Sequence, residues 1–202
     1  MLLMKKMLVA CFVIFFAGFF IKFFHIHYNA IVMLAGLFIL LAASLIAISK
    51  KENNVNGWAN LASAFWLAML LFTIKFYPFV SVVLALAVVF TLVAVLTTAK
   101  RKTWKTLTFP AMCLALALTF HLMPANSKYH LLNIRWSYEI DTDFPTWDKY
   151  AWFLYQNGKH DEALNASAKA LQLATEAGEA EWANFIADHK SRIEQGCWTT
   201  FR

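Results

Sequence analysis

Residues 79–99 read FVSVVLALAVVFTLVAVLTTA. These 21 positions contain no charged residue. At about 1.5 Å per residue, an α-helix of this length crosses the ~30 Å hydrocarbon core of a bilayer. A soluble chain of 202 residues, 60% of them apolar, has too little interior to bury so much apolar surface. The stretch therefore predicts a transmembrane helix.

Four more apolar runs surround this one, and each of the five has about 17 to 21 residues. Asparagine-rich or proline-containing segments separate several of them, as is typical of helix ends. The predicted fold is all-α, with a polytopic bundle of about five spans in residues 1–127 and a small soluble helical domain in residues 128–202. The predicted spans are about 7–24, 30–48, 59–77, 79–99 and 107–123.

The first run follows Lys5 and Lys6 and could also be interpreted as a signal peptide. We reject this interpretation, because no small-x-small cleavage site follows and the next apolar run begins almost at once.

Charge is divided unevenly along the chain. Residues 1–135 contain 12 Lys or Arg and one acidic residue, Glu52, whereas residues 136–202 contain 6 basic and 11 acidic residues. The basic residues lie between apolar runs, where anionic lipid headgroups and membrane topology explain them better than nucleic acid does. We therefore expect membrane lipids as partners and no nucleic acid.

Basic residues also predict the orientation. With five spans, eight of them fall on the same side as the N-terminus, and the positive-inside rule makes that side cytoplasmic. These eight are Lys5, Lys6, Lys50, Lys51, Lys100, Arg101, Lys102 and Lys105. The expected location is a bacterial inner membrane with the C-terminal domain periplasmic or external. If the fifth run lay in the interface instead, that domain would be cytoplasmic.

The ends of the first and third runs are similar in sequence, IKFF at 21–24 and IKFY at 74–77. Two interpretations stay open. The match can mark a duplicated helical hairpin, or Lys22 and Lys75 can each simply extend to the headgroups from a span's end.

Residues 17–27, AGFFIKFFHIH, together with LAGL at 34–37 resemble the membrane hairpin of GldL-type proteins of Bacteroidota. The resemblance implies a cell-envelope protein and, for the family's motor subunits, ion-driven gliding and type IX secretion. Those subunits carry a membrane-embedded carboxylate, and none of the predicted spans contains Asp or Glu.

The C-terminal segment contains Trp147-x3-Ala151-x6-Gly158-x4-Ala163-x6-Ala170, a spacing that resembles a tetratricopeptide repeat. In that motif small residues allow two antiparallel helices to approach closely, and the glycine permits the turn. We expect a third helix at about 179–194. Since one repeat cannot bury both of its faces, this helix, residues 128–146 or a partner should complete the core.

No catalytic, cofactor or metal site is predicted. The pair His25 and His27 supplies at most half of a coordination sphere. The acidic residues at 139, 141, 143 and 148 could suggest a divalent-ion loop, but the glycine and terminal Glu of an EF-hand are missing, which favours a solvated linker. Phosphate-loop, dinucleotide and hydrolase motifs are also absent from the sequence.

The predicted function is a non-catalytic, membrane-anchored adaptor or structural subunit of a cell-envelope complex. Helical spacing places Asp148, Trp152, Tyr155 and Gln156 together as candidate partner-binding residues. Alternatively, the two aromatic residues rest on the membrane surface or on residues 128–146. The alternative function is an accessory subunit of an ion-driven motor or transport complex; a membrane enzyme ranks third.

Overall fold

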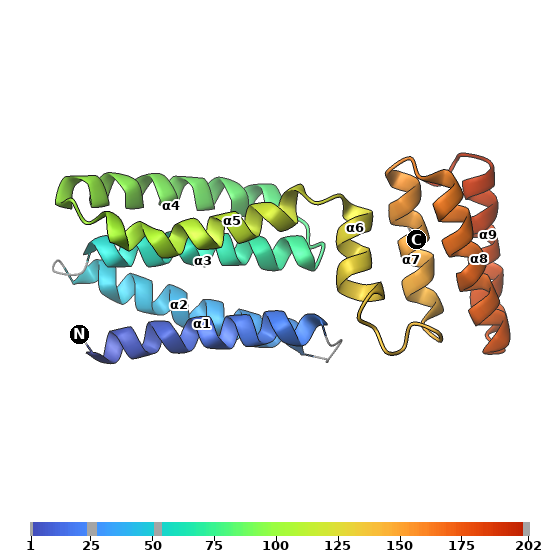
Figure 1. Cartoon of the computed structure of the whole chain (residues 1–202), viewed down its shortest axis with the longest axis horizontal. Coiled ribbons are helices and arrows are strands. Elements are labelled where there is room, and N and C mark those ends of the chain that lie inside the picture. The colour runs from blue at the N-terminus through green and yellow to red at the C-terminus, as the bar shows by residue number, and fades with distance from the viewer. Residues whose placement is uncertain (1, 24–27, 51–53, 200–202) are drawn as a thin grey trace. The chain divides into compact units, whose positions relative to one another are not determined.

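The computed structural model describes residues 2–23, 28–50 and 54–199. The described chain is all-α, as predicted, and contains no strand (Figure 1). It divides into two compact units. One holds α1 to α5 and the other holds α6 to α9, and each is described by itself below.

The first unit consists of five α-helices and one 3-10 turn. They are α1 (Leu2–Phe23), α2 (Asn29–Ser49), α3 (Asn54–Ile74), α4 (Val80–Arg101), η2 (Trp104–Leu107) and α5 (Thr108–Leu122). Within this unit the five helices run alongside one another in alternating directions (Figure 1).

Four segments of this unit are long and apolar enough to cross a membrane: Asn29–Ser49, Val55–Ile74, Val80–Arg101 and Trp104–Leu122. They indicate a multi-pass membrane protein. The described apolar part of α1, Val9–Phe23, falls in the shorter class of apolar helices. The predicted first span therefore stays a prediction.

Helix α3 is the centre of the first unit and packs against α2, α4 and α5. Most of its side chains are buried, and Leu67 and Leu70 are fully buried. A helix with apolar residues around its whole circumference is expected at such a central place. α3 begins at Asn54, five residues before the predicted run at 59, so the polar residues ahead of that run form the first helical turn.

Glycines mark the closest approaches between these helices. A Cβ atom built on Gly36 would lie 2.8 Å from the backbone N of Phe15, and one on Gly57 would lie 2.7 Å from the backbone N of Ile48. A Cβ on Gly18 would meet the backbone N of Met33 at 2.8 Å. Gly18 and Gly36 thus allow α1 to approach α2 closely, and Gly57 allows α3 to approach α2. Small residues commonly have this role between membrane helices.

Several polar side chains within the apolar helices have hydrogen-bond partners in the same or a neighbouring helix. The Trp66 Nε1 donates to Thr91 Oγ1 at 2.9 Å, which joins α3 to α4. The hydroxyls of Ser44 and Ser63 donate to the carbonyls four residues earlier, at 2.6 and 3.0 Å. Such bonds satisfy these groups where no water is present.

The two similar IKF segments lie at one end of the first unit. Lys22 is in the last turn of α1 and Lys75 follows the end of α3, while Lys50 and Lys100 lie at the opposite end, at the ends of α2 and α4. Lys22 is only 8% exposed, and its charge interacts with that of Lys75.

The second unit consists of α6 (Ala125–Tyr129), the π-helical turn η3 (His130–Ile134), α7 (Phe144–Gln156), α8 (His160–Glu176) and α9 (Ala180–Glu194). Within it, α7 packs against α8, α8 against α9, and α6 against α7. Figure 1 shows α7, α8 and α9 side by side. The third helix predicted at about 179–194 is confirmed as α9.

Glycine ends all three of the longer helices of this unit. Gly158, Gly178 and Gly196 have φ angles of 72°, 73° and 68°, a left-handed conformation that glycine adopts without the penalty of a Cβ. After α7, the N–H of Lys159 donates to the carbonyl of Leu154 at 3.0 Å, which is the long bond of a Schellman motif. The turn that the tetratricopeptide resemblance assigned to Gly158 is therefore present.

Candidate partner-binding face of the C-terminal unit

The start of α7 is fixed by a capping interaction. Asp143 Oδ1 accepts a hydrogen bond from the Thr146 N–H at 3.0 Å, and Asp143 Oδ2 accepts one from the Thr146 hydroxyl at 2.6 Å. Pro145 occupies the first turn, where its missing N–H has no cost. This cap sets the register that directs Ala151 and Leu154 into the core.

Small residues line the contact between α7 and α8. Ala151 on α7 and Ala163 and Ala170 on α8 are all fully buried. Without larger side chains between them, the two helices can approach closely. These are the positions at which the sequence spacing predicted small residues.

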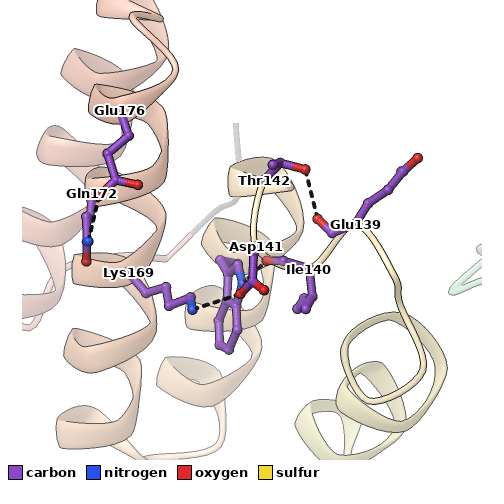
Figure 2. A network of polar contacts seen from close by, with 8 residues as sticks. Glu139, Ile140, Asp141, Thr142, Lys169, Gln172 and Glu176 are labelled. Carbon is purple, nitrogen blue, oxygen red and sulfur yellow. Dashed lines mark hydrogen bonds and ion pairs between the residues drawn. The ribbon is translucent and has the colours of Figure 1, made fainter.

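The segment before α7 is attached to this hairpin by polar contacts (Figure 2). The Trp147 Nε1 donates to the Ile140 carbonyl at 2.9 Å, and Asp141 forms an ion pair with Lys169 of α8 at 3.4 Å. The Lys169 ammonium also lies 5.3 Å from the centre of the Trp147 ring. Exposed pairs of this kind stabilise a fold weakly, by about 0–1 kcal/mol.

The acidic residues considered as an ion-binding loop are dispersed. Asp141 pairs with Lys169, Asp143 caps α7, and Asp148 is buried against α9. Among the described residues, no group of three or more His, Cys, Asp or Glu is placed to hold a metal ion. His25 and His27 lie outside the described residues.

The four predicted partner-binding residues differ in their surroundings. Asp148 is fully buried, Trp152 and Tyr155 are partly buried, and Gln156 is exposed. The Gln156 Nε2 donates to the Trp198 carbonyl at 2.9 Å, and the Tyr155 ring lies 6.3 Å from the Trp198 ring. Trp152 packs against the same core cluster, which includes Trp198. The face predicted to bind a partner is therefore partly covered by the chain's own C-terminal segment, and the binding role of the four residues stays a prediction.

Asp148 and His189 form a buried pair between α7 and α9. Asp148 Oδ2 lies 2.8 Å from His189 Nδ1, and the two side chains are 0% and 1% exposed. The other carboxylate oxygen, Oδ1, is buried and accepts no hydrogen bond from the described residues. Burial raises the pKa of Asp148 above its usual range, and the hydrogen bond and charge of His189 oppose that rise.

Aromatic rings enclose the imidazole of this pair. The His189 ring stacks on Trp198, with 4.4 Å between ring centres, and meets Phe185 at 4.1 Å. The packing removes water from the pair and attaches Trp198, which follows α9 in the sequence, to that helix. The pair thus forms a buried polar contact between α7 and α9.

Sequence reasoning missed both His189 and Trp198. His189 occupies an apolar-spaced position on α9, between Ile186 and Ile193, which are also buried. That spacing was a usable signal that the histidine faces the core. Trp198, an aromatic residue in a short polar tail, gave no periodic signal at all.

No family model, curated protein or solved structure significantly matches this chain. The likenesses to GldL-type hairpins and to tetratricopeptide repeats therefore rest on the residues quoted above, and both stay predictions.

Proposed function

We propose that this chain is a non-catalytic adaptor or structural subunit of a bacterial cell-envelope complex. The observation that supports the proposal is the hairpin of α7 and α8, built on fully buried alanines, in the same chain as a multi-pass apolar bundle. The hairpin resembles a unit of the tetratricopeptide type, and such repeats present extended surfaces for other proteins.

The proposed topology has α1 as a fifth span in addition to the four candidate spans. Helix α1 has 22 residues, a length sufficient to cross a bilayer, and Gly18 packs it closely against α2. Five spans with basic residues at the Lys50 and Lys100 end put the N-terminus in the cytoplasm and α6 to α9 outside the inner membrane.

The proposed partner surface is the part of α7 that Trp198 leaves accessible. Trp152, Tyr155 and Gln156 provide ring area and an amide there, the combination that is typical of binding hot spots. Asp148 contributes indirectly to this surface. It binds His189 of α9, and the His189 ring stacks on Trp198, so the pair helps to position the residue that covers part of α7.

Copurification from native membranes tests this proposal. Full-length protein carrying Trp152→Ala should retain its fold and bind a partner about 30-fold more weakly, since a hot-spot aromatic contributes about 2 kcal/mol. The matched control is Trp182→Ala, which removes another partly exposed tryptophan, on α9. Because Trp152 also packs on the core, Gln156→Lys serves as a second variant at an exposed residue, where the change removes one hydrogen bond, to the Trp198 carbonyl. Equal recovery of partners with all three variants would contradict the proposal.

An accessory subunit of an ion-driven motor or transport complex is the second candidate. The buried Lys22, interacting with the charge of Lys75, favours it, because ionisable groups within apolar helices commonly mark ion pathways. Reconstituted full-length protein should dissipate a proton or sodium gradient under this alternative, and Lys22→Gln should abolish the flux. We expect no flux from the chain alone, since a cation pathway generally requires carboxylates or other coordinating groups.

A further inference from the structure

A cavity of about 540 Å³ in the second unit is lined by residues of α6, η3, the middle of α7 and the start of α8. Its polar lining includes Asn126, His130, Arg135, Tyr150, Lys159 and Glu162. The volume is sufficient for a small polar ligand, and nothing proposed above assigns a role to it.

The π-helical turn explains why Arg135 reaches this cavity. Asn126 and His130 are four residues apart and share one face of the helix. In a regular α-helix the next residue on that face would be Ile134, which is instead buried. The N–H of Arg135 donates to the His130 carbonyl at 2.9 Å, five residues back, so the turn moves the guanidinium group onto the cavity side.

Asn126 provides a polar group without a hydrogen-bond partner in the described chain. Its side chain is 4% exposed and lines the cavity, and its Oδ1 is buried without a hydrogen-bond partner in the described chain. A buried amide oxygen in that state costs about 1–3 kcal/mol. With the Asn126 side chain turned toward the cavity, a ligand that donates an N–H or O–H to this oxygen would recover this free energy.

The cations of the cavity favour an anionic group on the same ligand. Lys159 is paired with Glu162 at 2.7 Å, whereas Arg135 contacts the Trp136 ring and forms no ion pair among the described residues. The cavity thus has one cation beyond its internal pair. Arginine binds phosphate well, because its planar fork matches two phosphate oxygens.

The position in the sequence indicates the source of such a ligand. Met123 lines the cavity and is the residue directly after Leu122, where α5 ends. Because α5 belongs to a candidate membrane span, the peptide chain keeps this rim within a few residues of the headgroup layer.

We propose that this cavity binds the headgroup of a phospholipid, with Arg135 on the phosphodiester and the Asn126 amide oxygen accepting a hydrogen bond from the headgroup's ammonium or hydroxyl. Phosphatidylethanolamine and phosphatidylglycerol both have such a donor. Phosphatidylcholine has the same phosphodiester and no donor, so it is a matched control ligand.

Native mass spectrometry of the full chain in dodecyl maltoside micelles, titrated with each of the three lipids, tests the proposal. We expect phosphatidylethanolamine and phosphatidylglycerol to bind about tenfold more tightly than phosphatidylcholine, which is the effect of one satisfied buried acceptor. Asn126→Ala should remove this preference, and Arg135→Gln should weaken all three lipids. Arg192→Gln, on the exposed surface of α9, is the control variant and should change nothing.

A preference that persists in Asn126→Ala, or affinities that Arg135→Gln leaves unchanged, would overturn the proposal. Because Asn126 is buried, circular dichroism must show that its variant is folded; Arg135 is exposed, so its variant tests the cavity independently. Soluble glycerophosphoethanolamine distinguishes the source. Failure to displace the lipid at comparable concentration supports a membrane headgroup, whereas displacement supports the same cavity chemistry with a soluble phosphodiester as its ligand.

Discussion

Removal of the His189 imidazole should destabilise the C-terminal unit far more than removal of the Asp148 charge. In His189→Ala the carboxylate of Asp148 stays fully buried and loses the partner that lies 2.8 Å away. A buried ion left without its partner costs about 3–5 kcal/mol. In Asp148→Asn the charge disappears while an amide oxygen remains to accept the hydrogen bond from Nδ1, so the expected loss is about 1 kcal/mol or less.

Hydrogen–deuterium exchange measures this difference in the intact protein, because slow amides report the free energy of local opening. With the full chain in lipid nanodiscs, amides in the middle of α7 and α9 should exchange roughly two to three and a half orders of magnitude faster in His189→Ala, the equivalent of about 3–5 kcal/mol. In Asp148→Asn the increase should be about fivefold or less. Amides of α1 to α5 provide an internal reference.

Lys190→Ala is the matched control on the same helix. Lys190 forms an exposed ion pair with Glu194 at 2.6 Å, and such a pair contributes about 0–1 kcal/mol. Two results would refute the reasoning. One is a His189→Ala effect no larger than that of Lys190→Ala, and the other is an Asp148→Asn effect equal to that of His189→Ala.

Three further predictions concern pH, helix packing and topology. Burial raises the folded-state pKa of Asp148, so its contribution to the stability of the unit is fully present below about pH 4 and is lost as pH rises through the raised pKa. Asp148→Asn should abolish this loss of stability in hydrogen–deuterium exchange measurements across the same pH range. Gly36→Leu should lower the stability of the detergent-solubilised protein by about 1–3 kcal/mol, since even a Cβ would lie 2.8 Å from the α1 backbone, whereas Ala35→Leu on the exposed side should not; equal melting temperatures would contradict this. Cys197 is exposed whereas the other two cysteines are buried, so an impermeant thiol reagent should label Cys197 in intact spheroplasts; labelling only after lysis would exclude the five-span topology.

The candidate site was only partly predictable. The α7–α8 hairpin follows from local spacing, because small residues and Gly158 recur at intervals that suit two short helices. The contacts that decide exposure are long-range: His189 is 41 residues from Asp148, and Trp198 is 42 residues from Gln156. From helical spacing alone, Asp148 was assigned to the outer, partner-binding face of α7. The buried pair with His189 shows that α9 covers Asp148.

What the sequence determined by itself is the class of protein. Uncharged runs of about 20 residues specify apolar helices whatever their neighbours are, because each helix satisfies its own backbone hydrogen bonds. Tertiary structure decided where polar groups became buried. The unpartnered amide oxygen of Asn126, the arginine redirected by the π-helical turn and the enclosed Asp148–His189 pair all depend on segments that come together only after folding. Local periodicity in the sequence does not predict such contacts.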